Sequence, residues 1–344
     1  MKAFNFAIVG CGFIAAKHAQ ALSDMPGCRL VAVYDVDNMA AEKLARSTGV
    51  QIYRSYDDLL ADPGVDVVNL CTPGSLHAVL GIKAASHGKH VLVEKPMAVT
   101  LEDADALIEA CDRAGVVLVT AHQNRFKGPV RALKTALEQE KMGRISHGSV
   151  VLRWNRNMDY YLQKPWRADA SQGGGVLLNQ AIHNIDLLQW MLGPVNTVYG
   201  LASSATPSLK AEESAVAVLK FASGVLGIIE ACSSVYPVNL EETLSIFGDN
   251  GTVILSGTSI GQVKKWQFAV NISKPPDHVV NPTDPGGYRP LLEDMVQCIK
   301  TGRKPLVDGW EGRKCLEIIQ AIKRSNRTGL PVNLPLFKDS KVNN

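Results

Sequence analysis

The feature that most constrains the fold is a glycine pattern directly after the first apolar run of the chain. Residues 4–9 read FNFAIV, and Gly10-Cys11-Gly12-Phe13-Ile14-Ala15 follows, ahead of a helical pattern. The first glycine suits a tight turn, the second lets another group approach the backbone, and Ala15 stands where helix and strand pack closely. The pattern predicts a strand, a turn and a helix whose free N–H groups favour a bound phosphate.

The first third of the chain alternates short β-branched runs with helical stretches. Such alternation, with nearly continuous apolar strands, predicts a doubly wound Rossmann domain with a parallel sheet covered on both faces. The expected strands are Phe4–Val9, Leu30–Tyr34, Val67–Leu70, His90–Val93 and Val116–Thr120, and the expected helices are Ala15–Ser23, Met39–Ser47, Ser75–His87 and Leu101–Ala114. We expect this domain to end near Ala121, after a sixth strand, and assign residues 1–121 to it.

Beyond residue 121 the runs are typical of antiparallel strands. The turn sequences at 222–224 (ASG) and 248–251 (GDNG) predict hairpins. The expected strands are Ser146–Trp154, Glu212–Phe221, Val225–Cys232, Leu244–Gly248 and Thr252–Leu255, and the expected helices are Pro129–Glu138, Val176–Met191, Tyr288–Lys300 and Glu311–Ser325. Asp308 and Glu311 have the spacing of a capping box. Residues 122–344 should form an α+β domain with a large, mostly antiparallel sheet, and Asn271–Gly287 its most mobile loop.

Composition and charge exclude several classes of protein. The chain has 344 residues, with 36 Lys and Arg against 33 Asp and Glu, and a net charge of +3 is too small to predict a nucleic-acid partner. The longest apolar stretch, Phe6–Ala16, is shorter than the roughly 20 residues that span a bilayer. We therefore expect neither a membrane partner nor a secretory signal. The seven cysteines are scattered and never in C-x-x-C spacing, which predicts reduced thiols in the cytoplasm and no metal site.

An acidic residue ends the second predicted strand, where a side chain can contact a ribose. Asp35 lies 25 residues after Gly10 and could accept hydrogen bonds from both hydroxyls of an adenosine ribose. Its charge would repel a 2′-phosphate, and residues 36–38 (VDN) offer no Arg or Lys to bind one. We therefore expect NAD rather than NADP as the cofactor. An ordinary turn residue at a strand end is the alternative.

Two further patterns indicate chemistry. Glu94-Lys95-Pro96 closes a predicted strand, and ligands bind at the carboxyl ends of strands in an open α/β sheet. Asn179 and His183 are spaced i and i+4 on the predicted helix, and Asp186 follows on the same face among apolar residues. The alternatives are a solvated lysine and a core histidine. Three polar residues on one face favour a site.

Four motifs occur together along nearly the whole chain: the glycine pattern, Cys71-Thr72-Pro73 with His77, Glu94-Lys95-Pro96, and the helix with His183. In this combination the chain resembles the Gfo/Idh/MocA oxidoreductases. The resemblance implies that Lys95 and His183 are the catalytic pair of an NAD-dependent dehydrogenase. It implies cofactor contacts from Gly10, Gly12, Phe13, Ile14, Asp35, Thr72, Pro73, His77, Glu94, Lys95, Gln123, Trp166 and Arg167, and substrate contacts from Lys95, Arg156, Tyr161, Asn179 and His183. Many members carry D-x-x-x-H on this helix, whereas this chain has Asn179 at the first position.

A narrower set of residues comprises Gln123-Asn124-Arg125-Phe126, Tyr160-Tyr161, Trp166-Arg167, the stretch 179–186, Val307-Asp308-Gly309 and Gly312-Arg313. This set is similar to the WlbA-type branch of the family, which oxidises UDP-N-acetylglucosaminuronic acid at its 3-hydroxyl, although Asn157-Met158 and Ala168-Asp169 depart from it. The resemblance implies oxidation of a secondary hydroxyl of a sugar or nucleotide sugar to a ketone. The alternatives are an inositol or free-sugar dehydrogenase and a redox-sensing regulator that binds NAD without turnover. A hydrolase or transferase has no nucleophile-elbow motif to support it.

The oxidation of a secondary alcohol requires a base that takes the hydroxyl proton. His183 could be this base while Lys95 donates a hydrogen bond to the same oxygen, or the two roles could be exchanged. Outside the site, Val216, Val218, Val225 and Ile228 would make the outer face of the second sheet apolar. An apolar face predicts a homodimer or homotetramer.

Overall fold

The structure of the chain is a computed structural model that describes residues 3–257, 260–275 and 286–336. It divides into two compact units. Unit 1 comprises Met1–Lys127, Ser171–Gly173 and Val279–Arg313, and unit 2 comprises Gly128–Ala170, Gly174–His278 and Lys314–Asn344. The helix predicted at Tyr288–Lys300 thus belongs to the first unit, although its place in the sequence had put it with the second expected domain. Among the described helices, none has the length and apolar character needed to cross a bilayer.

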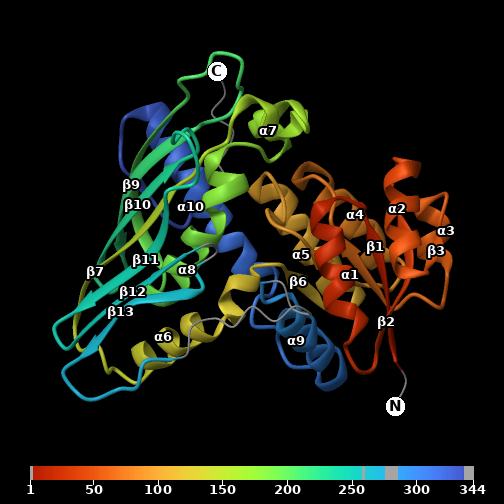
Figure 1. Cartoon of the computed structure of the whole chain (residues 1–344), viewed down its shortest axis with the longest axis horizontal. Helices are drawn as coiled ribbons and strands as arrows, with labels where there is room; N and C mark the ends of the chain where they lie inside the picture. The colour runs from red at the N-terminus through yellow and green to blue at the C-terminus, as the bar shows by residue number, and fades with distance from the viewer. Residues whose placement is uncertain (1–2, 258–259, 276–285, 337–344) are drawn as a thin grey trace. The chain divides into compact units, whose positions relative to one another are not determined.

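Unit 1 is built on a six-stranded parallel sheet of order β3-β2-β1-β4-β5-β6 (Figure 1). Its strands are β1 (Phe4–Val9), β2 (Cys28–Tyr34), β3 (Gln51–Ile52), β4 (Val67–Leu70), β5 (His90–Val93) and β6 (Leu118–Thr120). The strand order reverses between β1 and β4, and ligands bind at such a switch point in open α/β sheets. The predicted Rossmann fold is confirmed. The two-residue β3 was not predicted, and β6 begins two residues later than expected.

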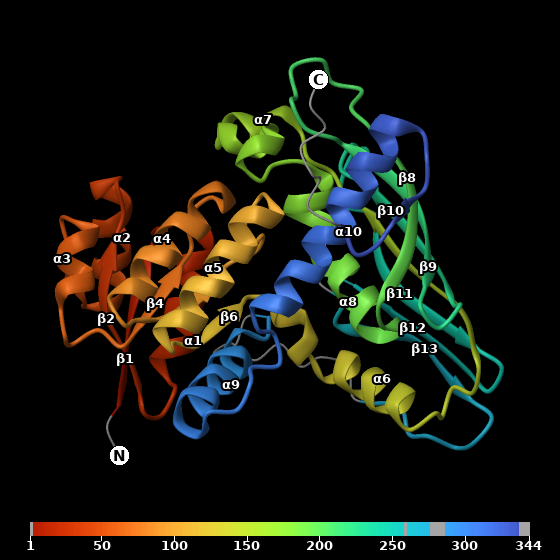
Figure 2. The ribbon, with the colours of Figure 1, turned by 180° about the vertical axis from the view of Figure 1, so that it is seen from behind.

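Helices cover both faces of this sheet. They are α1 (Phe13–Ser23), α2 (Asn38–Thr48), α3 (Tyr56–Ala61), α4 (Gly74–Ser86), α5 (Leu101–Ala114) and α9 (Tyr288–Thr301), with a short 3-10 helix η1 (Gln123–Phe126) after β6. Helices α1 and α9 pack on one face through buried residues such as Phe6, Leu22 and Leu292. Helices α4 and α5 lie on the other, seen in front in Figure 2, where a Cβ at Gly81 would meet Leu107 at 2.6 Å. The absence of a side chain at Gly81 lets these two helices pack closely.

Unit 2 contains an eight-stranded sheet of order β13-β12-β11-β7-β10-β9-β8-β14. Its strands are β7 (Ile145–Arg153), β8 (Val195–Ser203), β9 (Ser214–Phe221), β10 (Leu226–Cys232), β11 (Glu241–Gly248), β12 (Gly251–Ser256), β13 (Gln262–Phe268) and β14 (Val332–Asn333). Neighbouring strands in this order are antiparallel except β7 with β10, which are parallel. The mostly antiparallel sheet and both predicted hairpins, at residues 222–224 and around 249–250, are confirmed.

Helices cover one face of the second sheet. The helical segments of this part of the chain are α6 (Gly128–Glu138), α7 (Met158–Leu162), the 3-10 helices η2 (Pro165–Ala168) and η3 (Ala170–Gln172), the π-helix η4 (Val176–Ala181), α8 (Ile182–Leu192) and α10 (Gly309–Thr328). A Cβ at Gly148 of β7 would meet Leu188 and Leu192 of α8, and one at Gly200 of β8 would meet Ile322 of α10. These glycines let α8 and α10 lie directly on the strands.

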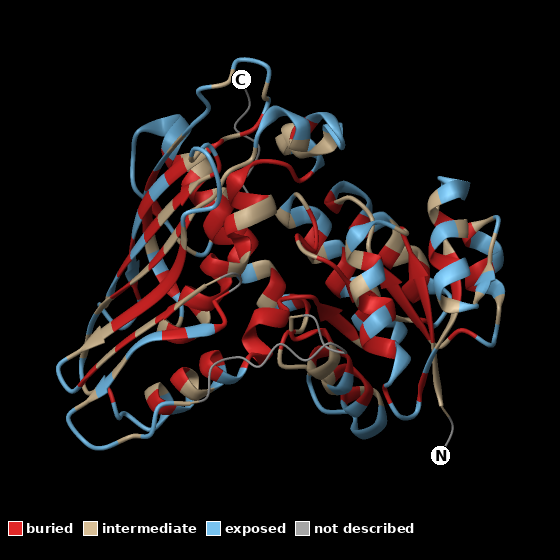
Figure 3. Cartoon of the chain, viewed as in Figure 1, coloured by how far each residue is buried: buried red, intermediate tan, exposed pale blue. Residues whose placement is uncertain are grey.

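The other face of the second sheet carries exposed apolar side chains. Strands β9 and β10 alternate between buried and exposed residues, as Figure 3 shows by colour. Val216, Val218 and Ile228 keep 53%, 55% and 45% of their surface exposed. Val225 is half-buried and precedes β10 instead of lying in it, so it is not part of this face.

Two local predictions concern the capping box at Asp308 and the loop Asn271–Gly287. Asp308 Oδ1 accepts the Glu311 N–H at 2.9 Å, the bond from cap to helix that a capping box requires, and the Glu311 carboxylate accepts a hydrogen bond from Arg125 at 2.8 Å. The expected mobile loop Asn271–Gly287 lies mostly outside the described residues, because 276–285 are not described.

Candidate active site

The glycine loop of unit 1 presses its backbone against the turn that follows β4. Gly10 has a φ of 89°, and a Cβ there would lie 2.8 Å from the backbone of Cys71 and Thr72. Gly12 caps α1 without any side-chain hydrogen bond, and a Cβ on Gly12 would meet nothing within 4 Å. The loop therefore leaves the first N–H groups of α1 open to a ligand, the arrangement that binds a pyrophosphate.

The residues after Gly12 have different environments. Phe13 is 75% exposed at the start of α1, with the Lys17 ammonium 4.9 Å from its ring centre. Ile14 is half-buried, and Ala15 is completely buried against the sheet. The small side chain of Ala15 lets the helix lie close to the strands, as the motif predicts.

Asp35 is bonded directly to the glycine loop. Its Oδ2 accepts the Cys11 N–H at 2.6 Å, and its Oδ1 accepts the Asp37 N–H at 2.9 Å. Burial and the negative charge of Asp35 raise the pKa of the Cys11 thiol to about 12. The half-buried carboxylate is thus fixed at the end of β2, and each oxygen keeps lone pairs for the hydroxyls of a ribose.

The turn between β4 and α4 is held by His77. Its Nδ1 lies 2.7 Å from the Pro96 carbonyl and its Nε2 lies 2.8 Å from the Thr72 carbonyl, so the buried ring bridges this turn and the one after β5. Burial lowers the pKa of His77. Pro73 caps α4, again without a side-chain bond, and the buried Thr72 Oγ1 has no hydrogen-bond partner in the described part of the chain. A polar ligand could supply that partner.

Glu94 and Lys95 follow β5, and the Lys95-Pro96 peptide bond is cis. Glu94 is 4% exposed; its Oε1 lies 2.8 Å from His18 Nε2 and its Oε2 accepts the Lys95 N–H at 3.1 Å. Burial alone would raise the pKa of Glu94, but the hydrogen bond with His18 and the charge of Lys95 bring it below its usual value. The carboxylate beside Lys95 is therefore anionic.

Gln123 is a further expected cofactor residue in unit 1. It lies in η1, is 8% exposed, and donates from Nε2 to the Tyr288 hydroxyl at 3.3 Å. Its buried Oε1 has no hydrogen-bond partner among the residues described.

His183 and Asn179 stand in unit 2 on two kinds of helix. The single helix predicted at Val176–Met191 is wrong in detail, because Val176–Ala181 is a π-helix and the α-helix begins at Ile182. Gly175, with a φ of 91°, precedes this turn, and a Cβ there would lie 2.6 Å from the Glu212 carboxylate, which accepts the Leu177 N–H at 3.1 Å. Asn179 and His183 therefore do not lie on one regular α-helix, the geometry on which the predicted i, i+4 stripe depends.

Tyr160 is the centre of a polar cluster around this π-helix. Its hydroxyl accepts hydrogen bonds from Asn179 Nδ2 at 3.0 Å and Gln180 Nε2 at 2.7 Å. The guanidinium carbon of Arg167 lies 4.0 Å from its ring centre, and that of Arg156 lies 5.1 Å from it. The structure thus brings the expected residues Arg156, Arg167 and Asn179 together around a tyrosine that was not among them.

The two arginines of this cluster bond only to neutral acceptors. Arg156 donates to the Asn155 carbonyl at 2.6 Å, Asn239 Oδ1 at 3.1 Å and Gln180 Oε1 at 3.3 Å, and its buried Nε has no partner among the described residues. Arg167 donates to the Tyr160 carbonyl at 2.9 Å. Neither forms an ion pair with a carboxylate of the described residues. Two uncompensated positive charges beside one ring favour an anionic ligand.

Two other expected residues lie next to this cluster. Tyr161 is 7% exposed and its hydroxyl lies 3.3 Å from Ser233 Oγ, so it packs towards β10. Trp166 is half-buried in η2, and a Cβ at Gly174 would meet its carbonyl oxygen at 2.7 Å. Sequence reasoning missed Tyr160 and Gln180. The neighbouring pairs Tyr160-Tyr161 and Asn179-Gln180 held the signal, but a pair does not show which member faces the site.

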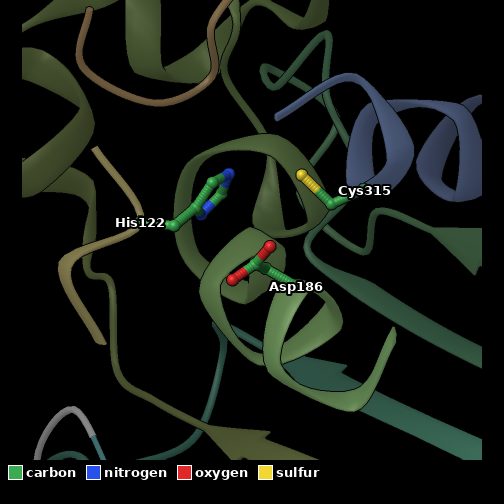
Figure 4. A group of neighbouring side chains, drawn as sticks. All are labelled: His122, Asp186 and Cys315. Atoms are coloured by element: carbon green, nitrogen blue, oxygen red, sulfur yellow. The ribbon is translucent and has the colours of Figure 1, made fainter. Parts of the chain in front are cut away.

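Asp186 follows His183 on α8 and is completely buried. Within unit 2 its carboxylate and the thiol of Cys315, on α10, lie within 4.8 Å of each other (Figure 4). The third residue drawn there, His122, belongs to unit 1. Two groups of one unit are fewer than the three or four protein ligands that a zinc site uses.

Comparisons with known proteins identify the family. The model of the oxidoreductase family with an NAD-binding Rossmann fold matches residues 4–122, and that of the GFO/IDH/MocA C-terminal domain matches 130–254. The WlbA dehydrogenase of Bordetella pertussis, solved in complex with NADH and UDP-GlcNAcA, is 33% identical, covers 98% of this chain and 99% of its own, and superposes with a TM-score of 0.90. This chain belongs to the Gfo/Idh/MocA oxidoreductase family.

Curated relatives of this family member act on different substrates. A D-apiose dehydrogenase of Paraburkholderia graminis is 26% identical over 97% of this chain and 90% of its own length. A scyllo-inositol 2-dehydrogenase (NAD(+)) of Bacillus subtilis is 26% identical over 95% of both chains. The chain is therefore an NAD-dependent dehydrogenase that acts on CH–OH groups, while these relatives differ in substrate.

The residues of unit 1 fit the cofactor that the family uses. Gly10 and Gly12 leave room for a pyrophosphate at the start of α1, and Asp35 presents a carboxylate to a ribose. The buried Thr72 hydroxyl, which no described residue satisfies, is a further polar contact. The preference for NAD predicted from Asp35 agrees with the NADH-bound relative.

Proposed function

We propose that this dehydrogenase oxidises a secondary hydroxyl of an anionic sugar, in the first instance the 3-hydroxyl of a UDP-N-acetylaminohexuronic acid, to a ketone. The observation that carries the proposal is the cluster of Arg156 and Arg167 around Tyr160, whose two positive charges meet no carboxylate of the described chain. Guanidinium groups bind carboxylates and phosphates in bidentate fashion, and such a substrate carries both. The 33% identity to a protein solved with UDP-GlcNAcA supports the same class.

The proposed chemistry assigns separate roles to Lys95 and His183. Bound NAD supplies the hydride acceptor, and the protein supplies the proton acceptor and the groups that orient the alcohol. In our proposal His183 takes the hydroxyl proton, because an imidazole titrates near neutral pH, and the Lys95 ammonium donates a hydrogen bond to the same oxygen and stabilises its developing charge. Asn179 and Tyr160 orient the substrate beside the arginines. The exchanged assignment, with Lys95 as base, is the alternative.

The remaining expected contacts stay proposals with these roles. Gly10, Gly12, Phe13, Ile14, Asp35, Thr72, Pro73, Glu94, Gln123 and Trp166 would contact the cofactor. Arg167, which the resemblance assigns to the cofactor, takes the substrate-binding role proposed above. His77 would act indirectly, because both of its ring nitrogens face backbone carbonyls. Tyr161 would support the substrate site through its packing on Ser233.

A substrate panel tests the function. NAD reduction at 340 nm would be measured with UDP-N-acetylglucosaminuronic acid, UDP-N-acetylglucosamine, N-acetylglucosaminuronic acid, myo-inositol and free hexoses. We expect UDP-N-acetylglucosaminuronic acid, which carries both a diphosphate and a carboxylate, to have the highest kcat/KM. A higher kcat/KM for myo-inositol or a neutral hexose would favour the alternative of an inositol or free-sugar dehydrogenase, and no turnover of any alcohol with intact NADH binding would favour a regulator.

Matched variants test the arginine cluster within the same panel. Arg156→Gln and Arg167→Gln should each raise KM for the acidic substrate at least tenfold, because each removes a charge-assisted contact of about 1.5–3 kcal/mol. Lys164→Gln is the control, because Lys164 is an exposed cation on the same loop. Equal effects of the three substitutions would remove the arginines from substrate binding.

We further propose that the protein is a homo-oligomer in the cytoplasm. The exposed Val216, Val218 and Ile228, on neighbouring strands, support burial of this sheet face against a second copy. The seven cysteines are all free thiols, which is typical of a reducing compartment. The oligomeric state is measured by light scattering at micromolar concentration.

A further inference from the structure

A chain of buried polar groups leads from α1 to the turn that carries Lys95. His18 on α1 is completely buried, and so is Asn69 on β4. The Asn69 side-chain amide nitrogen lies 2.9 Å from His18 Nδ1, and His18 Nε2 lies 2.8 Å from the Glu94 carboxylate. Glu94 in turn accepts the Lys95 N–H at 3.1 Å. All four residues belong to unit 1.

The partners of His18 determine which of its nitrogens carries the proton. The Cys71 thiol donates to Asn69 Oδ1 at 3.8 Å, which turns the amide nitrogen towards the imidazole. An amide nitrogen can only donate, so His18 Nδ1 must accept. The single ring proton of the neutral imidazole is then on Nε2 and is donated to Glu94. His18 is therefore a neutral donor that stabilises an anionic carboxylate.

The charge on Glu94 depends on this donor. Burial disfavours the anion and the hydrogen bond from His18 opposes that effect, so the pKa of Glu94 lies below its usual value. The titratable groups that act on Glu94 from the surrounding elements are His18 of α1, Lys95, and Cys71 and His77 on either side of the β4–α4 turn. Without His18, the carboxylate would keep its desolvation penalty and lose its strongest donor. It would then bind a proton.

The interaction between Glu94 and Lys95 is reciprocal. The positive charge of Lys95 lowers the pKa of Glu94, and the same Coulomb energy favours the charged form of Lys95. An anionic Glu94 thus keeps the lysine protonated, as a hydrogen-bond donor. A neutral Glu94 would remove that bias.

We propose that His18 is a positioning residue, which acts on Lys95 through Glu94. His18 holds the Glu94 carboxylate ionised against the Lys95 backbone. The lysine then serves as the ammonium donor and not as the base. The proposal rests on the proposed catalytic role of Lys95. It selects one of the two assignments that the residues alone leave open, because a lysine kept charged cannot take the hydroxyl proton.

The first test examines the ionisation states in the protein without ligands. The ¹⁵N shifts of histidine-labelled protein, assigned with His18→Leu, should show His18 as the neutral tautomer with its proton on Nε2 near pH 7. A protonated Glu94 would give a carboxyl band in the infrared spectrum that the Glu94→Gln substitution removes. The wild-type spectrum should lack this band, and the His18→Leu spectrum should contain it. An imidazolium at His18, a proton on its Nδ1, or a protonated Glu94 in the wild type would overturn the proposal without any assay of turnover.

The second test follows turnover and its pH dependence. His18→Leu should lower kcat at least roughly tenfold, a part of the 10²–10⁴ that an acid–base group supplies, and should move a limb of the kcat profile. His18→Gln, whose amide can still donate, should restore most of the loss. NADH affinity should change less than kcat, because Glu94 is the only expected cofactor contact whose charge changes. The exposed His87 on the same unit provides the control His87→Leu, expected to behave as wild type.

The outcomes separate this proposal from the proposed function. A Lys95→Met variant with near wild-type kcat would refute the catalytic lysine, and the role of His18 with it. An inactive Lys95→Met variant together with a fully active His18→Leu variant of unchanged pH profile would refute the positioning role alone. If His18→Leu does not fold, His18→Gln carries the comparison, because its donor is predicted to preserve both the anion and the pH profile.

Discussion

The choice between NAD and NADP should depend on a single carboxylate, that of Asp35. The informative change is Asp35→Asn, which keeps the size of the side chain and one acceptor oxygen. That oxygen can still accept the Cys11 N–H, now at 2.6 Å from Oδ2, so the glycine loop should keep its shape. What disappears is the negative charge, together with the oxygen that accepts the Asp37 N–H at 2.9 Å.

The size of the effect follows from two contributions. Hydrogen bonds from ribose hydroxyls to a charged acceptor are about twice as strong as neutral ones, so NAD should lose about 1 kcal/mol. A 2′-phosphate about 5 Å from the carboxylate would be repelled by about 1–2 kcal/mol at an effective dielectric constant suited to a half-buried group, and this repulsion vanishes. The ratio of the two Kd values should therefore move towards NADP by about 2–3 kcal/mol, or roughly 30- to 150-fold.

Calorimetric titration of NADH and NADPH into both proteins measures the ratio directly. Asp37→Asn is the matched control, since Asp37 is an exposed carboxylate two residues away that caps α2, a role that Asn fills equally well. The control should leave the ratio unchanged. If Asp35→Asn keeps the wild-type ratio and the wild-type thermal midpoint, the carboxylate does not discriminate between the cofactors, and its bond to Cys11 is only structural.

Three further predictions follow from individual contacts. Arg125 is completely buried in unit 1 and pairs with Glu311 at 2.8 Å. Arg125→Met should therefore leave a poorly solvated carboxylate and lower the free energy of unfolding, measured by urea titration, by about 3–5 kcal/mol. The double variant Arg125→Met/Glu311→Leu should recover much of this loss. His183→Asn should lower kcat roughly 10²–10⁴-fold and retain NADH affinity. The acid limb of the wild-type profile of kcat against pH, where the imidazole becomes protonated, should disappear in this variant. A variant that keeps most of its kcat would make His183 a packing residue. Val218→Asp, at the centre of the exposed sheet face, should give a smaller particle by light scattering, whereas an unchanged mass would place the interface elsewhere.

The sequence predicts unit 1 well because its fold depends on local patterns. The central strands β1, β4, β5 and β6 are short, mostly apolar runs that are largely buried, and the connections carry glycine, proline or capping residues that end one element and begin the next. The element that was assigned to the wrong part of the chain is α9. Its amphipathic pattern predicts a helix, but no local pattern states that Leu291, Leu292 and Met295 complete the core around Phe6, nearly 300 residues earlier.

The candidate site was predictable wherever a residue type is required by backbone geometry. Gly10 must be glycine because of its φ and its approach to Cys71, and this constraint is visible as a motif. His18 lacked such a signal. It lies on the buried face of a helix with alanine and leucine neighbours, a pattern typical of a core histidine. Only the structure shows that its partner is Glu94, which is 76 positions away in the sequence.

The π turn shows most clearly why spacing alone did not give the site in unit 2. The apolar residues at 176–178, 181, 182 and 185 satisfy an α-helical pattern equally well with or without one extra residue in a turn, so the sequence does not reveal the insertion. The insertion changes the chemistry, because Asn179 donates to the Tyr160 hydroxyl in the cluster with the two arginines. Asn179 thus belongs to the polar cluster that we propose binds the substrate. Asp186, three residues after His183 on the regular α-helix, is the carboxylate that keeps the spacing of a shared face.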